Sequence, residues 1–532
     1  MITKKLYIKH LGDEEFVKEK QKNYSYAFRR LYKMIEESSD KEFVSRFKET
    51  FSLNDIEFRS LLTDVKSFKE REIKEWEIKE ARISELSKFL QKNNLTKRER
   101  FKAQRRMAYL SRGIGRESVF GGRSLLQRLS RECNRKCRDE EKINQLRAEF
   151  RDNRILPFFV IGEANYKGNR FFSIKNLAQG EVVYKPHRGK KISITVNIPR
   201  GWEKDLQKLV ELSERKEIPF SVMLSTKHLC VIYDEERLNG YAVDEVARRA
   251  EVREIKKQRH PKEVESQLIR DTYRAYYDKQ RAQKLVGKVP NRCLAVDMNP
   301  TEIGFSVLDK AKEGAKVIRC GLIDLSKICQ KSSQASYSRK SKYFANKRHY
   351  EITIIVKRFF KIAKHYGCSS FVLEELRLSE TLSREANRKV KNIWNRMLFI
   401  NCVRRRCNEN GIDLDEVNPC YSSFIGNIQH PYADACNASI EIGRRGLHRY
   451  ENGGFYPHIA EEDIRTLEAK FGDVVGCSTV GNWAEIYKSL TNSIDKVEFA
   501  HRLRTGMDEA LTPHTSFSID SYKSRVKINI FN

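Results

Sequence analysis

Three acidic residues that are far apart in the chain have the side-chain type and placement of metal ligands. Asp297 interrupts the apolar run Cys293–Met298, and Glu374 closes another apolar strand. Asp434 lies in a helix-like segment that opens near residue 431. A carboxylate inside so apolar a strand costs several kcal/mol unless it is paired or bound to a metal. Three such carboxylates brought together would be hard oxygen ligands for Mg²⁺ or Mn²⁺.

The chemistry available to such a trio is phosphodiester hydrolysis. Two divalent ions roughly 3.5–4 Å apart activate a water and stabilise the leaving 3′ oxygen, so no protein nucleophile is needed. Taken singly, Asp297 could form a strand-end turn, Glu374 could face solvent at an edge, and Asp434 could cap a helix. Their joint placement favours the metal site. Asp415 is the alternative third ligand, and Glu375 is expected to be exposed or to lie outside the ligand set.

The elements that would position these acids follow the order strand, strand, strand, helix, strand, helix, strand, helix. We expect strands at 293–298, 303–308, 316–324, 371–376 and 412–417, and helices at about 343–366, about 383–410 and from about 431. This order is that of the ribonuclease H scaffold, in which the first and fourth strands are neighbours. Asp297 and Glu374 would then approach each other across the sheet, and the last helix would bring Asp434 to the same edge.

The rest of the chain predicts a multidomain α+β protein. A short strand at 4–10 precedes a charged helical region, and β-rich runs separated by Gly, Asn or Pro begin near residue 155. A long charged helical pattern covers about 241–285, and helical patches at Ile459–Phe471 and Trp483–Leu490 lie in an unassigned tail. The expected divisions are 1–40, 41–150 (basic and helical), 151–240 (β-rich), 241–290 (connecting helix), 291–446 (the α/β domain with the three acids) and 447–532.

The charge balance requires an anionic partner. The 532 residues include 103 Lys+Arg and 72 Asp+Glu, a net charge of +31. Nucleic acid is the first candidate and an anionic membrane surface the second; because the charge recurs along the whole chain, nucleic acid is favoured. Residues 96–138 hold 14 Lys+Arg and 3 Asp+Glu. Besides a solvated helix face, this excess predicts phosphate contacts by Arg105, Arg106, Arg112, Arg116, Arg123 and Arg128.

Several classes of protein and site are disfavoured. No run approaches the roughly 18–20 apolar residues of a membrane-spanning helix, and the N-terminus has no apolar signal-peptide run. We therefore expect a cytoplasmic protein without a membrane partner. None of the 12 cysteines forms a C-x-x-C pair, so we expect reduced thiols and no zinc site.

The segment 293–446 resembles the RuvC domain of the TnpB transposon nucleases and the type V CRISPR effectors. Leu294–Pro300 with Gly304–Val307 is similar to their first motif, and Phe371–Leu376 to their second. The third motif is matched by Tyr432–Ile440 followed by Arg444, Arg445 and Gly446, after a turn-like stretch at Val417–Ser423; the intervening helix with Trp394 fits too. Two features depart from the family pattern. Its four-cysteine zinc ribbon is reduced to Cys420 and Cys436, and Asn437 follows Asp434 by three residues where many members have two.

This resemblance implies an RNA-guided DNA endonuclease of prokaryotic or phage origin. It assigns the catalytic and metal-binding roles to Asp297, Glu374 and Asp434, with two Mg²⁺ or Mn²⁺ ions as cofactors. It implies a guide RNA and a double-stranded target DNA as partners, a wedge domain at 1–40 and 151–240, and a recognition insert at 41–150. An unguided RuvC-like resolvase or transposase, and a guide-dependent DNA-binding repressor that does not cut, are the alternatives. The oligomeric state stays open.

Overall fold

The structure is a computed structural model that divides into two compact units. It describes residues 1–91, 95–112, 114–115, 118–135, 137–187, 189–258, 260–299, 302–312, 314–324, 341–375, 396–451, 454–472, 482–505 and 528–531. The first unit comprises residues 1–238, and the second contains the described residues from 239 onward. None of the helices described is long and apolar enough to cross a membrane.

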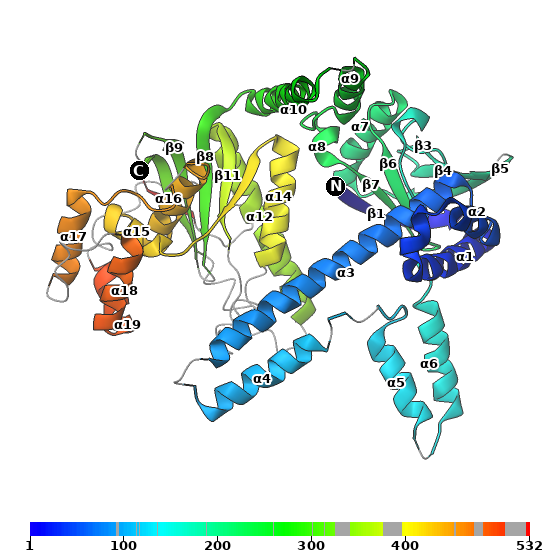
Figure 1. Cartoon of the computed structure of the whole chain (residues 1–532), viewed down its shortest axis with the longest axis horizontal. Coiled ribbons are helices and arrows are strands. Elements are labelled where there is room, and N and C mark those ends of the chain that lie inside the picture. The colour runs from blue at the N-terminus through cyan, green and yellow to red at the C-terminus, as the bar shows by residue number, and fades with distance from the viewer. Residues whose placement is uncertain are drawn as a thin grey trace. The chain divides into compact units, whose positions relative to one another are not determined.

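The first unit combines one antiparallel sheet with a set of helices (Figure 1). Its strands are β1 (Ile2–Leu11), β2 (Phe158–Val160), β3 (Phe172–Asn176), β4 (Glu181–His187), β5 (Lys190–Asn197), β6 (Phe220–Leu224) and β7 (His228–Tyr233). Its α-helices are α1 (Glu14–Lys33), α2 (Lys41–Thr50), α3 (Asp55–Leu90), α4 (Lys97–Ser111), α5 (Arg123–Cys133), α6 (Glu140–Asp152), α7 (Glu203–Glu214) and α8 (Glu235–Leu238). Short 3₁₀ turns lie at Ile35–Ser39, Ala164–Tyr166 and Arg200–Trp202.

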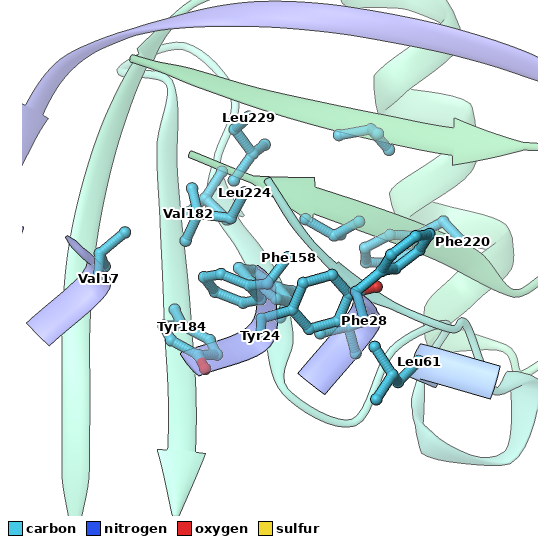
Figure 2. Packing of buried hydrophobic residues seen from close by; sticks show 14 of the residues in the cluster. Val17, Tyr24, Phe28, Leu61, Phe158, Val182, Tyr184, Phe220, Leu224 and Leu229 are labelled. Carbon is cyan, nitrogen blue, oxygen red and sulfur yellow. The ribbon is translucent and has the colours of Figure 1, made fainter. Parts of the chain in front are cut away.

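The sheet of the first unit has the strand order β2-β6-β7-β1-β5-β4-β3. The N-terminal strand therefore lies in the middle of strands that all begin at or after Phe158. Alternate residues of β4, β5, β6 and β7 are buried, which is the period of a sheet with one covered face. Figure 2 shows this core, where Phe28 of α1 and Leu61 of α3 pack with Phe158, Tyr184 and Phe220.

The predicted strand at 4–10 and the predicted helical pattern over about 41–150 are confirmed, and the β-rich segment also holds elements that were not predicted. β4, β6 and the helix α7 are additional to the four strand runs recognised in the sequence. In the insert, the 36-residue helix α3 begins with a capping box between Asn54 and Glu57 and carries α4 near its end through Leu86 and Leu110. α5 and α6 form a separate helical pair.

The second unit is built on a six-stranded mixed sheet. Its strands are β8 (Val289–Met298), β9 (Glu302–Lys310), β10 (Ala315–Asp324), β11 (Cys368–Glu374), β12 (Asp413–Val417) and β13 (Ile528–Phe531). Its helices are α9 (Glu245–Lys257), α10 (Lys262–Leu285), α12 (Ser341–His365), α14 (Arg396–Asn410), α15 (Ser422–Gln429), α16 (Asp434–Leu447), α17 (Glu461–Phe471), α18 (Trp483–Ser493) and α19 (Lys496–Arg504). The predicted helix at 383–410 is described only as α14; its first part, with Trp394, lies outside the described residues.

The strand order in this sheet is β12-β11-β8-β9-β10-β13. β8, β9 and β10 pair antiparallel, whereas β11 runs parallel to both β8 and β12. The prediction that the first and fourth strands of this region are neighbours is therefore confirmed. The single helical pattern expected at 241–285 is two helices, separated near Pro261, which cannot donate a backbone hydrogen bond inside a helix.

Helices cover both faces of this sheet, which explains why Cys293–Val296 of β8 is a continuous apolar run. Leu294 and Val296 pack with α12 and α14, in a cluster that includes Phe359 and Phe399. The alternate residues of β8 pack with α16 in a second cluster, which contains Cys293, Ala295, Val372, Ile440 and Ile442. The sheet is thus the middle layer of the second unit, and α16 covers one of its faces (Figure 1).

Candidate active site

Asp297 and Glu374 lie next to each other at the ends of two adjacent parallel strands. The register pairs Leu373 of β11 with Val296 of β8, so the residue that follows each of them is an acid. The backbone N–H of Met298 donates to Oε1 of Glu374 at 3.2 Å, which ties the second carboxylate to the strand that carries the first. Both residues are buried, Asp297 with 6% and Glu374 with 5% of its surface exposed.

Both acids point to the face of the sheet that α16 covers. Side chains alternate along a strand, so Asp297 shares a face with Ala295, and Glu374 shares a face with Val372. Ala295 and Val372 both pack against α16. Asp434 is the first residue of that helix, so the sheet and the helix bring all three predicted acids toward the same edge.

Glycines allow α16 to approach the sheet this closely. A β-carbon on Gly304, which pairs with Asp297 across β8 and β9, would overlap the backbone of Ala435. Further along the helix, a β-carbon on Gly446 would overlap the side chain of Val372. The backbone of the first turn of α16 therefore rests directly on β9, opposite Asp297.

Two asparagines orient the third acid. Asn427 of α15 donates to Oδ1 of Asp434 at 2.7 Å, and Asn437 donates to Oδ1 of Asn427 at 3.0 Å. Asn437 is fully buried and also bonds the backbone of His430 and Tyr432, which closes the turn between α15 and α16. Sequence reasoning missed Asn427, because no element was predicted between the turn-like stretch ending at Ser423 and the helix-like segment near residue 431, and an asparagine carries no signal of its own there.

A cation approaches the site from the C-terminal helices. Nη2 of Arg504, the last residue of α19, donates to Oδ2 of Asp434 at 3.0 Å. Sequence reasoning missed this residue too, since the tail after residue 446 carried no recognisable motif. On the other side of the site, Nδ2 of Asn299 donates to Oδ2 of Asp297 at 2.8 Å.

The pKa of Asp297 reflects the proximity of the other acids. Burial raises the pKa of Asp297 well above the usual range, and the negative charges of Glu374, Asp434 and Glu302 raise it further. Glu302, at the start of β9, is a fourth acid near the site that the sequence analysis did not select. This mutual repulsion means that the metal-free site is electrostatically unfavourable when all the acids are ionised.

The three carboxylates have the chemistry of ligands for a hard divalent cation, although their oxygens do not form a complete coordination shell. Asp297 and Glu374 are buried and Asp434 is half-buried, and a divalent cation would relieve the repulsion among their carboxylates. Among the residues that the structure describes, no three His, Cys, Asp or Glu side chains are close enough together to hold a metal ion. Asp434 is instead engaged by Asn427 and Arg504.

The structure pairs the alternative third acid, Asp415, with a different cation, and it leaves Glu375 exposed. Asp415 of β12 accepts a hydrogen bond from Nη1 of Arg449 at 2.8 Å and is not among the groups that shift the pKa of Asp297. Glu375 is exposed, and its backbone N–H donates to the carbonyl of Val417. The geometry therefore favours Asp434 over Asp415 as the third member.

The arginine pair after the third acid is part of the scaffold. Arg444 and Arg445 are buried, and each donates from Nε to the carboxylate of Glu441 at 2.7 Å. Nη1 of Arg445 also donates to the carbonyls of Asn418 and Cys420, at 2.6 and 2.8 Å. Arg445 therefore joins α16 to the segment between β12 and α15.

The predicted phosphate-binding arginines lie in the first unit on α4, α5 and the turn after α4. Arg105, Arg112, Arg123 and Arg128 are exposed, and Arg106 is half-buried with its guanidinium 5.4 Å from the ring centre of Tyr109. Arg116 lies outside the described residues. These positions are compatible with phosphate contacts, which remain a prediction.

No family model matches the chain, and no curated protein matches it. The solved structures that align with it include two complexes, both at 11% sequence identity. The alignment with a chain of a Cas12f1–sgRNA–target DNA complex covers 83% of this chain and 98% of that chain, with a TM-score of 0.31. A CRISPR-Cas12f ternary complex covers 83% and 99%, with a TM-score of 0.20. Superpositions with scores this low support no assignment.

Proposed function

We propose that the protein is an RNA-guided DNA endonuclease whose ribonuclease H-like (RuvC) domain hydrolyses phosphodiester bonds with two divalent metal ions. The observation that carries the nuclease part is the register of β8 against β11, which sets Asp297 beside Glu374 under the first turn of α16. The strand order β12-β11-β8-β9-β10, with β8 to β10 antiparallel and β11 and β12 parallel to β8, supports the ribonuclease H-like assignment.

In this proposal Asp297, Glu374 and Asp434 would hold the ions. Bound there, Mg²⁺ or Mn²⁺ supplies an activated water and stabilises the charge on the leaving oxygen. Asn427 of α15 holds Oδ1 of Asp434 by a hydrogen bond, and Asn299 holds Oδ2 of Asp297 by another. These hydrogen bonds give two of the carboxylates a defined orientation, and metal binding would draw the three acids closer together.

The guided part of the proposal is supported by the motif resemblance and by charge. A guide–target duplex presents a dense row of phosphates, and a net charge of +31 provides many possible contacts to them. The excess of arginine on α4 and α5 lies outside the unit that holds the acids. This separation suits a protein in which one part holds nucleic acid and another part cuts it.

Cleavage by the full-length protein tests the nuclease. The protein is purified from cells in which the non-coding DNA next to its gene is also transcribed, and the RNA that co-purifies is sequenced. A DNA carrying the sequence complementary to that RNA is then incubated with Mg²⁺. We expect cutting by the wild type and none by Asp297→Ala or Glu374→Ala, with DNA binding nearly unchanged. Cutting by either variant would rule out the assigned site.

The same preparation separates the alternatives. A defined RNA species, whose removal with ribonuclease abolishes DNA binding, is expected for a guided enzyme. Metal-dependent cutting without any bound RNA would favour the unguided resolvase. Guide-dependent binding without cutting by the wild type would favour the repressor.

A further inference from the structure

The ion pair between Arg504 and Asp434 joins the otherwise unassigned C-terminal helices to the candidate site. The distance from Nη2 to Oδ2 is 3.0 Å, and 61% of the arginine side chain is exposed to solvent, against 23% for the aspartate. A guanidinium that exposed can be reached by a large substrate from outside the protein. It is also paired with the acid that the proposed metal needs.

Arg504 is held at the site by the packing of its own helix. Phe499 and Leu503 of α19 are buried in one cluster with Phe424 and Ile425 of α15, the helix that also supplies Asn427. The end of α19 is fixed further by Lys470 of α17, whose Nζ donates to the carbonyls at the helix terminus. The backbone near Arg504 is thus fixed, while its exposed guanidinium has room to turn.

The two oxygens of Asp434 have different partners. Oδ1 accepts from the neutral amide of Asn427, and Oδ2 accepts from the cationic Arg504. Oδ2 is therefore the oxygen open to exchange, because a divalent ion bound to it would lie beside a guanidinium of like charge. The ion and Arg504 compete for this oxygen.

The geometry points to two successive contacts for Arg504. It is the counter-ion of Asp434 in the metal-free protein, and on metal binding it turns to the substrate phosphate beside the site. A guanidinium pairs with phosphate oxygens through two parallel hydrogen bonds, so the released side chain has a partner when DNA is present. This inference rests on the proposed nuclease function and adds a residue outside the acidic trio.

Two measurements on the full-length protein test this. Calorimetric titration of the metal-free protein with Mn²⁺, without nucleic acid, should show Arg504→Ala binding about tenfold tighter than wild type, because a competing cation has been removed. Single-turnover DNA cleavage at saturating Mn²⁺ should fall about 100-fold in the same variant, because alanine cannot bind the substrate phosphate. Arg504→Lys should recover part of the rate, since it keeps the charge but not the planar fork.

Arg502→Ala is the matched control. Arg502 lies on the same helix and pairs with Glu498 at 2.7 Å, so this variant makes the same change in charge away from Asp434. It should leave both measurements unchanged. Opposite changes in Arg504→Ala support the inference, because a merely structural residue would weaken metal binding and cleavage together.

Weaker or unchanged Mn²⁺ binding in Arg504→Ala overturns the inference. If Asp297→Asn and Asp434→Asn lose Mn²⁺ binding in the same titration, the proposed function survives that failure. If both asparagine variants bind Mn²⁺ as the wild type does, the proposed metal site itself is wrong. The two failures are therefore distinguishable.

Discussion

Gly304 of β9 lies against the backbone of Ala435, one residue after the third acid of the candidate site. A side chain at position 304 would overlap the carbonyl group of Ala435. Because Gly304 also pairs with Asp297 across the strands, this contact sets how near Asp434 comes to Asp297. A small residue on one strand thus fixes the spacing of two acids that are 137 positions apart in the sequence.

Replacing this glycine is expected to damage both stability and metal binding. Gly304→Ala forces α16 away from β9, and such overpacking typically costs about 1–3 kcal/mol. Mn²⁺ affinity should fall as well, because Asp434 moves with the helix. Chemical denaturation and Mn²⁺ titration measure the two effects. Gly201→Ala is the control, since a β-carbon there meets nothing within 4 Å; equal effects of both variants would contradict this account.

Asp297→Asn is expected to stabilise the metal-free protein. Burial and the neighbouring acids raise the pKa of Asp297 in the folded state. Above the unfolded pKa of about 3.9, the folded state therefore binds more protons than the unfolded chain, and this carboxyl lowers stability as the pH rises. The asparagine variant carries no such charge, so it should be more stable than the wild type, and by more at higher pH.

The measurement is urea denaturation of both proteins between about pH 5 and pH 8 with a chelator, a range above the unfolded pKa of the carboxyl. The stability difference in favour of Asp297→Asn should grow with pH, and added Mg²⁺ should stabilise only the wild type. A difference that does not change with pH would show that the Asp297 carboxyl does not titrate as the geometry requires.

Asn427→Leu tests the hydrogen bonds that orient the third acid. The substitution removes the donor to Oδ1 of Asp434 and the acceptor for Asn437. Loss of a partner that orients a metal ligand typically weakens metal affinity about 10–100-fold. Gln429→Leu on the same helix is the control, because Gln429 bonds Asp463 and should alter only stability. Equal Mn²⁺ affinity in the two variants would contradict the role given to Asn427.

The basic face of α4 is tested by the salt dependence of RNA binding. Neutralising Arg105, Arg106 and Arg112 together should weaken binding and lower the slope of log K against log salt by about 0.7 for each single-strand phosphate that the variant no longer neutralises. A control variant with the same change of charge replaces Lys204, Lys208 and Arg215 by alanine, in or next to α7. The same drop in slope for both variants would mean that net charge matters and the position of α4 does not.

The parts of the site that could be predicted are those fixed by local pattern. The strand carrying Asp297 was recognisable because apolar residues on both faces of a covered strand leave a lone acid conspicuous. The partner of that strand followed from the order of the elements, and the observed register agrees. Because side chains alternate along a strand, the positions of Asp297 and Glu374 then place both acids on the same face of the sheet.

The parts that could not be predicted depend on contacts between distant segments. Nothing local distinguishes Asn427 from a surface asparagine or Arg504 from any other helix-terminal arginine, and each acquires its role only when α15 and α19 pack beside α16. The helix α15 was not predicted; its buried residues Phe424, Ile425 and Ile428 pack with residues of α17, α18 and α19. In the first unit, β4 and β6 were missed, although the alternation of their buried residues is clear once the sheet is seen.

The length of α3 has a mechanical consequence. At 1.5 Å per residue, its 36 residues span about 54 Å, and it joins α4 to the β-sheet end of its unit as one stiff rod. A tilt of only about 5° at the base would swing the far tip by about 5 Å, which is close to the pitch of one helical turn. A small rotation at the base of α3 therefore moves the cationic face of α4 at its tip by a much larger distance.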